Sequence, residues 1–386
     1  FYTLPYKDKD FVTDILNNFE IGDYASFIDH IDILEKLELI EIQYDYVKIS
    51  EQNLSTYFFY KSFVKENLLS FEVLLNSYFI KNKHRFDDCI VPTCNTFGYE
   101  NVRDKIRTSL VKYCKSILDD KELSLELLSV FGFFIPEETM KFIYDVIDCL
   151  PENDTSYYRI DNDNTHDNYL KQDKIIELLS GFYMYPGDNF TSSLELSFEY
   201  VRKQPQLLTE LLNKIKSVLS INCNDEQTGF VRQNNLYRLL IDNVNKNDLL
   251  YIKAFYELSK LFLSFRFEHT EFGRNNTFTI SYNTISCNKY INGLRKSIWD
   301  CICMNFTEDA LQLLENYIKP TLKNVKEIIE YDIPFICLII EKHFSSDSYL
   351  HCKFVQGYIR WCKNNKVTYH LFEHLSQKYI NSTYEL

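Results

Sequence analysis

The sequence predicts a mainly α-helical protein: an irregular, solenoid-like array of helical repeats that follows an N-terminal winged-helix-like α/β unit and carries one inserted β-hairpin. The 386 residues include only 9 Gly and 8 Pro, and a many-stranded sandwich, barrel or propeller needs more turn-forming residues than that. Apolar residues recur at helical spacing over most of the chain. Helix pairs of about 35 to 45 residues follow one another without a strict period, which is typical of an irregular solenoid. We expect a winged-helix-like domain over residues 1–85, a helical array over 86–265, the hairpin over 266–285 and a second helical array over 286–386.

The first 85 residues show the order helix, helix, hairpin, helix, which is that of a winged helix. Apolar residues repeat at helical spacing before residue 38, and two short β-favouring runs follow. Ser and Asp are good N-caps because their side-chain oxygens accept hydrogen bonds from the free N–H groups of the first turn. The predicted elements are, in order, a helix over residues 11–19, a helix over 27–37 capped by Asp23, a hairpin over 39–49, and two helices capped by Ser50 and Ser70.

The exposed face of the second predicted helix is mostly acidic. A winged helix that reads DNA places Arg, Lys, Asn or Gln on this face, close to the phosphates. An acidic face repels a phosphate backbone, so we favour a packing or interdomain role for this unit. The face carries Asp29, His30, Asp32, Glu35, Lys36 and Glu38.

Helical spacing returns after residue 102 and dominates the rest of the chain. Three helices are predicted between residues 102 and 150, with Pro136 and Pro151 at their boundaries. Further helices are predicted over residues 170–184, 192–203, 206–221, 236–245, 249–265, 290–299, 311–317, 325–343, 350–361 and 368–380.

Residues 152–168 are polar and rich in Asn and Asp, which predicts a loop or insertion. Asp161, Asp163 and Thr165 stand at alternate positions there, as the first ligands of a calcium loop do. Position six of that loop would be His166 instead of Gly, and position twelve would be Gln172 instead of Glu. Because the sharp turn and the bidentate ligand are both missing, we do not expect a calcium site.

Residues 266–285 change from helical to alternating spacing. Apolar and polar side chains alternate on both sides of the turn-forming residues 273–276, which predicts a β-hairpin inserted among helices. The aromatic side chains of this hairpin cannot all be buried on one side, so an exposed edge is expected to meet a protein partner. The candidate protein-binding residues are Phe267, His269, Phe272, Arg274, Phe278 and Tyr282.

Charge and cysteine content limit the partners and the compartment. The net charge is −13, so nucleic acid is disfavoured as a partner and protein is favoured. Eleven scattered Cys and no leader pattern predict free thiols in a reducing compartment, the cytoplasm. The longest apolar stretches, residues 127–135 and 333–340, are far shorter than the ~20 residues of a membrane span. Because the sequence starts at Phe1, we expect a processed chain or a piece of a longer one.

Catalytic and cofactor motifs are missing from the sequence. None of the nine Gly residues stands in a P-loop, and no nucleophile elbow, zinc-protease motif or kinase loop is present. Cys301 and Cys303 would point about 200° apart on a helix, so burial is favoured over redox pairing. We therefore expect this chain to be neither an independent enzyme nor the holder of a cofactor.

One combination of residues could supply four zinc ligands. His370 and His374 are four positions apart on a predicted helix, and Cys352 and Cys362 lie upstream. The paired Cys-x2-Cys knuckle that preforms such a site is missing. We favour a plain helix face with two histidines and expect no metal.

Two stretches resemble the regions that follow the ATPase core in large bacterial STAND NTPases, including those of antiviral defence. In residues 48–79, Ser50, Gln52, Leu54 and Tyr57 match a "Ser-x-Gln-x-Leu-x-x-Tyr" helix that follows the winged helix there. Residues 270–336 contain TEFGRNNTFTI, LRKSIWDCI and EYDIPFI, which are similar to the hairpin and helical array in the C-terminal halves of those proteins.

The resemblance implies a regulatory and sensor module of a longer protein. ATP and Mg would then bind only to an upstream domain, the trigger would be a protein, often viral, and homo-oligomers would form through the parent protein. A second hypothesis is a stand-alone helical scaffold for protein interactions, and a third is a nucleic-acid-binding winged-helix protein.

Overall fold

The computed structural model describes residues 3–153, 158, 160, 172–222, 225, 227–272, 277–319 and 325–379. The chain divides into two compact units, Phe1–Asp145 and Val146–Leu386. Both are built mainly of helices, which confirms the predicted fold class, whereas the solenoid-like character of the array stays a prediction. The expected boundary between residues 85 and 86 lies within α4 (Phe71–Phe97), shortly after a kink at Asn82.

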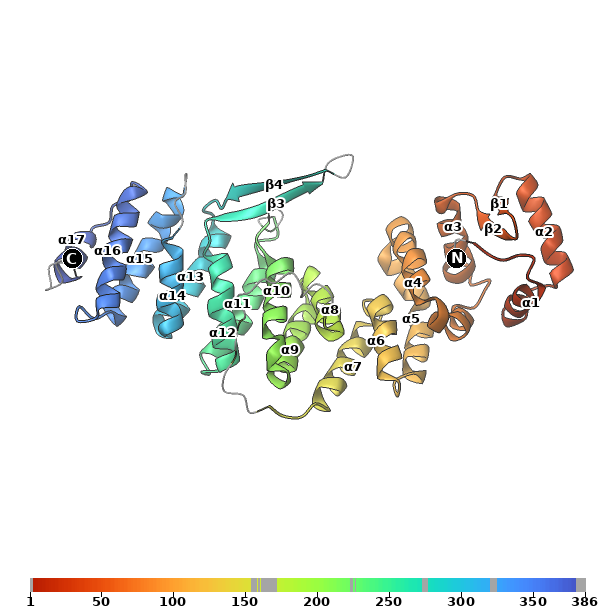
Figure 1. Cartoon of the computed structure of the whole chain (residues 1–386), viewed down its shortest axis with the longest axis horizontal. Helices are drawn as coiled ribbons and strands as arrows, with labels where there is room; N and C mark the ends of the chain where they lie inside the picture. The colour runs from red at the N-terminus through yellow and green to blue at the C-terminus, as the bar shows by residue number, and fades with distance from the viewer. Residues whose placement is uncertain are drawn as a thin grey trace. The chain divides into compact units, whose positions relative to one another are not determined.

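The first unit begins with the predicted order of helix, helix, hairpin and helix (Figure 1). Three further helices and most of a fourth complete it. Its elements are α1 (Lys9–Asn18), α2 (Tyr24–Lys36), β1 (Ile40–Gln43), β2 (Tyr46–Ile49), α3 (Gln52–Phe59) with a π-helical turn at Tyr60–Lys65, α4, α5 (Tyr99–Ser116), α6 (Lys121–Phe131) and α7 (Pro136–Asp148), which runs across the boundary between the units.

A small core holds the winged-helix-like part together. Ile31 of α2, Ile40 of β1 and Val47 of β2 are buried in contact with one another. Leu4 forms an isolated antiparallel β-bridge to the hairpin, because its backbone N–H and C=O pair with those of Val47 at 2.7 and 2.8 Å. These long-range contacts fix the hairpin against the helix that precedes it.

Two of the three predicted N-caps are confirmed. The Asp23 carboxylate accepts the backbone N–H of Ser26 at 2.8 Å, and the Ser70 hydroxyl accepts that of Val73 at 3.3 Å. The cap predicted at Ser50 is wrong: its hydroxyl donates to the carbonyls of Glu38 and Leu39, at 3.1 Å each. Ser50 therefore closes the open end of the hairpin instead of starting a helix.

The second unit is a run of helices interrupted by one hairpin (Figure 1). Helices close in sequence pack together: α8 contacts α9 and α10, α11 contacts α12 and α13, and α13 contacts α15. The elements are α8 (Lys174–Gly181), α9 (Asp188–Lys203), α10 (Leu208–Leu219), α11 (Val231–Val244), α12 (Leu249–Phe262), β3 (Arg266–Phe272), β4 (Phe278–Thr284), α13 (Lys289–Met304), α14 (Glu308–Tyr317), α15 (Lys326–His343), α16 (Tyr349–Asn364) and α17 (Phe372–Tyr379), with 3-10 turns at Phe182–Met184 and Pro205–Leu207.

Aromatic side chains fill much of the space between these helices. Tyr237 of α11 lies edge-on to Phe255 and Phe262 of α12, with ring centroids 5.9 and 5.2 Å apart. Such rings bury large areas and prefer this edge-to-face arrangement. The same use of aromatic residues recurs where α13, α14 and α16 meet, around Trp299, Tyr317 and Trp361.

The predicted hairpin is confirmed. β3 and β4 pair antiparallel from Arg266 opposite Thr284 to Phe272 opposite Phe278. Within the described part of the chain the two strands form a sheet of their own, and Figure 1 shows them as a ribbon that leaves the helices of the second unit. None of the described helices combines the length and the hydrophobicity that crossing a bilayer requires.

Candidate protein-binding site

Strand β4 exposes three apolar side chains at alternate positions. Phe278 and Tyr282 are each 64% exposed, and Ile280 between them is 46% exposed. Alternate residues of a strand point to the same face of the sheet, so these three form one face. A contiguous group of exposed apolar side chains costs solubility and often marks a surface for a partner. We call Phe278, Ile280 and Tyr282 the β4 face.

The strand register separates the predicted binding residues. Phe267 is half-buried and lies opposite Asn283. Tyr282, the residue before Asn283, lies opposite Glu268 instead. Phe267 therefore belongs to the opposite side of the sheet from the β4 face. His269 and Phe272 lie in β3, but their side chains are outside the described part of the chain, as is the whole of Arg274.

Ile280 is part of the β4 face although it was not among the predicted binding residues. It stands between Phe278 and Tyr282 in the same alternating pattern. The alternating pattern is therefore sufficient to predict Ile280 as part of this face. It was left out of the predicted binding residues because it is not aromatic.

The root of the hairpin is anchored in the core. Phe265, directly before β3, is buried between Tyr317 and Trp361, with ring centroids 4.8 and 5.7 Å away. The backbone N–H of Ile285, directly after β4, donates to the Phe265 carbonyl at 3.0 Å. Both ends of the hairpin are thereby fixed at one place in the array.

A buried ion pair lies beside this root. Arg295 of α13 and Asp332 of α15 are both almost fully buried, and the guanidinium contacts the carboxylate through Nη2 and, at 3.2 Å, through Nε. Trp299 Nε1–H donates to the same carboxylate at 2.9 Å, and Tyr317 O–H donates to it at 2.7 Å. The carboxylate is thus surrounded by donors, as a buried charge must be.

The remaining Arg295 donors hold the end of α12. Nη1–H groups donate to the carbonyls of Phe262 and Ser264 at 3.1 and 3.0 Å, and an Nη2–H donates to that of Leu263 at 3.1 Å. The last carbonyls of a helix have no partner within the helix, so an external donor must satisfy them. Arg295 therefore fixes the chain just where it leaves α12 and enters the hairpin.

Burial and charge determine the protonation of this cluster. Burial disfavours the charged form of Arg295, but the nearby Asp332 carboxylate outweighs this and raises the pKa of the guanidinium. Burial also raises the pKa of Tyr317 well above its usual value, and Asp332 raises it further. Arg295 therefore stays charged and Tyr317 stays protonated over the ordinary pH range.

The sequence carries a signal for this pair, although neither residue was predicted to have a role. Arg295 lies among Ile291, Leu294 and Ile298 on the apolar face of α13. Asp332 stands in the same way among isoleucines on the buried face of α15. Opposite charges on two apolar helix faces indicate a buried pair, although 37 residues separate them.

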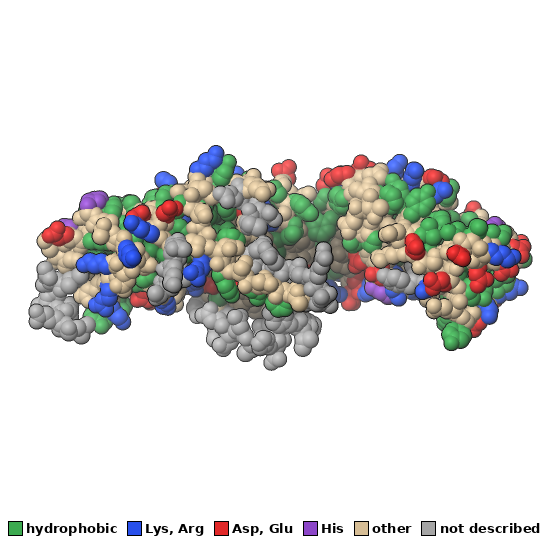
Figure 2. Space-filling view, turned by 90° about the horizontal axis from the view of Figure 1, so that it is seen from above, with side chains coloured by type: hydrophobic (Ala, Val, Ile, Leu, Met, Phe, Trp, Pro, Cys, Tyr) green, Lys and Arg blue, Asp and Glu red, His purple; other side chains and the backbone are tan. Residues whose placement is uncertain are grey.

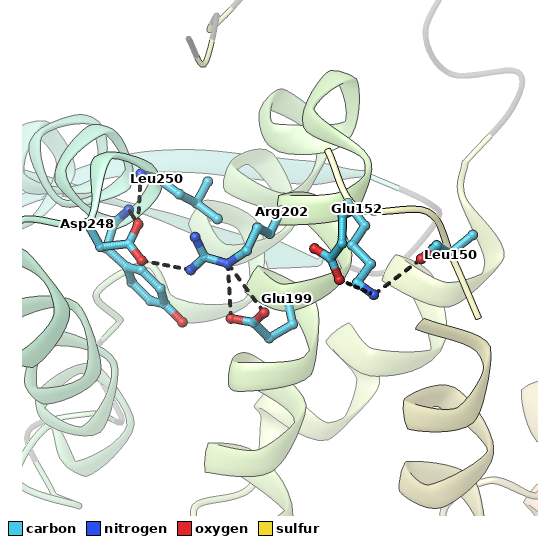
Figure 3. Close-up of polar contacts among 8 residues, drawn as sticks. Leu150, Glu152, Glu199, Arg202, Asp248 and Leu250 are labelled. Atoms are coloured by element: carbon cyan, nitrogen blue, oxygen red, sulfur yellow. Dashed lines mark hydrogen bonds and ion pairs between the residues drawn. The ribbon is translucent and has the colours of Figure 1, made fainter. Parts of the chain in front are cut away.

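A second polar cluster ties α9 to the start of α12 (Figure 3). Arg202 Nη2–H donates to the Asp248 carboxylate at 2.7 Å, and Nε–H lies 3.3 Å from both carboxylate oxygens of Glu199. Asp248 also caps α12 by accepting the Leu250 N–H at 3.0 Å. Burial opposes the charge on Arg202, but its partners Asp248 and Glu199 raise its pKa. These side chains satisfy one another, which indicates a structural role.

Lys203, the next residue of α9, fixes the segment that follows α7. Its ammonium group donates to the Leu150 carbonyl at 3.2 Å and lies 3.0 Å from the Glu152 carboxylate (Figure 3). The lysine side chain is largely buried, so its two partners keep it from being an unpaired internal charge.

The acidic surface expected on α2 is present. Asp29, Asp32, Glu35 and Glu38 are exposed, and none of them belongs to an ion pair among the described residues. The first 50 residues contain four Lys against eleven Asp and Glu, a net charge of −7, more than half of that of the chain. Figure 2 shows acidic and hydrophobic side chains, with some basic ones, mixed over the surface of the first unit. This surface repels a phosphate backbone.

The metal-ligand candidates do not come together in the described part of the chain. His374 lies in α17, whereas His370 precedes that helix, so the predicted spacing on one helix face is wrong. Cys352 and Cys362 are buried in α16 as free thiols. Among the described residues no group of three or more His, Cys, Asp or Glu side chains is placed to hold a metal. Asp161, Asp163, Thr165 and His166 lie outside the described residues.

Cys301 and Cys303 are both buried in α13 as free thiols, in agreement with the burial expected for them.

Comparison with known proteins adds no relative. No protein-family model, no curated protein and no solved structure matches the chain.

Proposed function

We propose that this chain is a protein-binding helical array that presents its β-hairpin to a partner protein. The observation that carries the proposal is the exposed β4 face on a hairpin with a buried root. Aromatic and aliphatic side chains that are already held in place lose little entropy on binding, so they make good anchors for a partner.

The strand edges support the same proposal. A two-stranded sheet has no inner strand, so the outer edge of each strand carries backbone groups that the sheet does not pair. An extended segment of a partner can pair with such an edge while its side chains contact the β4 face. In this proposal the chain binds a partner and carries out no reaction of its own.

A narrower form of the proposal makes the chain the regulatory and sensor module of a STAND NTPase in the cytoplasm. It rests on the sequence resemblance alone, at Ser50, Gln52, Leu54 and Tyr57 and over residues 270–336. The partner would then be a trigger protein, possible examples being viral proteins, and its binding would control upstream ATPase and effector domains. ATP and Mg would bind only upstream, and oligomers would form through the parent protein.

A stand-alone scaffold for protein interactions is the alternative within the same binding function. The coding sequence upstream of Phe1 distinguishes the two. A P-loop in the same reading frame supports the sensor module, and a start codon directly before Phe1, with no ATPase partner, contradicts it.

Affinity purification tests the binding function. The full chain and the double variant Phe278→Ser/Tyr282→Ser are each purified from cells that contain the candidate partner protein. The proteins that copurify with each are then quantified. The matched control is Tyr185→Ser, because Tyr185 is 78% exposed elsewhere in the second unit. We expect the double variant to lose at least about tenfold of the captured partner and the control to retain it. Equal capture by all three proteins would contradict the proposal.

A further inference from the structure

A cavity lies at the root of the hairpin, apart from the β4 face. Its volume is about 270 Å³. It opens between the end of α12, the first residue of β3 and the end of α14. The side chains that matter for its chemistry are Lys260, Ser264, Arg266, Leu313, Asn316 and Tyr317.

Arg266 is an arginine without a carboxylate partner among the described residues. Its Nε–H has no contact with solvent and no hydrogen-bond acceptor in the described part of the chain. Three other arginines whose placement in this unit is described each have a carboxylate partner: Arg202 pairs with Asp248, Arg232 with Asp225 and Arg295 with Asp332. A buried donor without an acceptor is unfavourable, and a ligand that supplies the acceptor removes that penalty.

The charge around the cavity is positive, although the chain as a whole is acidic. No described residue that lines the cavity is Asp or Glu. Lys260 lines it together with Arg266, and the Lys319 ammonium group lies 2.7 Å from the Asn316 side-chain oxygen. Lys260 is partly neutralised, because it shares the Glu257 carboxylate with Lys216. The guanidinium of Arg266 is thus the positive group at this cavity that has no carboxylate partner in the described ranges.

The other walls are apolar. Leu263, Phe265 and Leu313 contribute hydrocarbon surface. The Tyr317 hydroxyl already donates to Asp332, so Tyr317 offers its ring and no free donor. Pockets of this kind, apolar with a few placed polar groups, are typical of sites for small ligands.

We infer that this cavity binds an oxyanion, a carboxylate or phosphate group carried on an apolar stem. The planar guanidinium of Arg266 offers parallel N–H donors to two oxygens of such a group, and the apolar walls take up the stem. The group comes either from a free small molecule or from an acidic side chain of a bound protein. The inference stands apart from the proposed function, because it does not involve the β4 face.

Calorimetric titration of the full chain tests it with defined probes. The free-molecule probes are phenylacetate and phenyl phosphate, the peptide probe is acetyl-Phe-Glu-amide, and benzyl alcohol is the neutral control. We expect saturable binding of at least one acidic probe and none of benzyl alcohol. Binding of the free acids alone identifies a small-molecule site, and binding of the peptide identifies a site for an acidic side chain.

Two variants connect the binding to the cavity. Arg266→Gln is expected to weaken the acidic probes by about tenfold, and Arg266→Lys by less, because lysine keeps the charge but loses the paired donors. Arg360→Gln, on the exposed surface of α16, is the matched control and should leave the affinity unchanged. Circular dichroism verifies that each variant is folded.

A spectroscopic readout covers weak binding. In a chain with 15N-labelled arginine, the Arg266 Nε–Hε signal, assigned by its loss in Arg266→Lys, should shift on addition of phenyl phosphate. The inference is overturned if no acidic probe shifts this signal, if benzyl alcohol shifts it equally, or if Arg266→Gln binds as tightly as the parent chain.

Discussion

Asp332 accepts hydrogen bonds from Arg295, Trp299 and Tyr317 inside the second unit, so it is the residue on which the root of the hairpin depends. Replacing it by Asn removes the charge that balances Arg295. Loss of one partner of a buried ion pair costs about 3 to 5 kcal/mol, because the other charge stays buried without compensation. We expect Asp332→Asn to lower the free energy of unfolding by this amount, as measured by urea denaturation.

The matched control is Asp300→Asn. Asp300 also forms an ion pair, but its partner is Lys296 on the exposed surface of α13, and the two groups are 2.6 Å apart. Exposed pairs contribute less than about 1 kcal/mol. If both variants lost the same stability, the buried cluster would not have the importance that its geometry indicates.

Glu257 makes the stability of the second unit depend on pH. Burial would raise the pKa of its carboxyl group, but hydrogen bonds from Lys216 and Lys260 outweigh burial and lower it. Because the pKa is lowered, the charged form of Glu257 stabilises the fold. This stabilisation is complete at pH values above the ordinary pKa of 4.5. It is lost as the pH falls through the pKa of the folded state. The stability advantage of the parent chain over Glu257→Gln should therefore shrink between pH 6 and pH 3. Denaturation curves over this range that keep a constant difference would contradict the assignment.

The cysteines should differ strongly in reactivity. Burial raises the pKa of Cys301 to about 11 and those of Cys337 and Cys362 to about 12, whereas Cys149 is exposed. The thiolate is the reactive form, so the buried thiols are both inaccessible and protonated. A short pulse of iodoacetamide at pH 8, followed by peptide mass spectrometry, should label Cys149 first and leave the other three unmodified until the chain unfolds. Equal labelling of all four in the folded chain would show that these helices open readily.

Among the elements, the hairpin is expected to be separable from the helices that carry it. The described side chains of β4 are mostly exposed, and the core contacts at the root come from Phe265 and Ile285, outside the strands. Replacing residues 267–283 by a short Gly-Ser linker should change the free energy of unfolding by less than about 1 kcal/mol. Circular dichroism should stay helical. Cooperative loss of helix would show that the hairpin is part of the core.

The same element was among those that the sequence predicted best, because its signal is local. Alternation with a period of two on both sides of a turn is visible within 20 residues, and a change from helical spacing marks both ends. The sequence did not predict that Phe267 lies on the opposite side of the sheet from the β4 face. That placement depends on the register of the two strands, which the local pattern does not give.

Helix α4 shows where local reasoning fails. Its backbone leaves helical geometry at Asn82, where two helical segments meet at a kink, and Pro92 lies inside the second segment. The second segment is held in place because Phe86 and Ile90 are buried in the core, where Phe86 meets Phe131 at 5.9 Å between ring centroids. Tertiary packing overrides the local signals there.

The aromatic run at Tyr57–Tyr60 is only partly buried. Tyr57 is 43% exposed and its three neighbours are half-buried. Tyr60 stacks on Phe97 with 3.8 Å between ring centroids. Four consecutive residues of a helix point in all directions, so they cannot all face one core.

At the scale of the whole chain, the charge distribution indicates what kind of partner is favoured. The acidic surface is concentrated in the first 50 residues, and the cavity beside Arg266 is a positively charged place in the second unit. A partner that contacts the first unit should be basic, and one that contacts the root of the hairpin should carry an oxyanion. The acidic surface of the first unit repels a phosphate backbone.

Photo-crosslinking is a direct test of whether a partner protein binds at the β4 face. Benzoyl-phenylalanine is placed at Tyr282 or, as the control, at Tyr185, and the cells that contain the candidate trigger are irradiated. We expect a single protein to be crosslinked from position 282 and not from position 185, and Phe278→Ser to abolish this product. The same crosslinked products from both positions, or none from position 282 while the partner still binds, would contradict it.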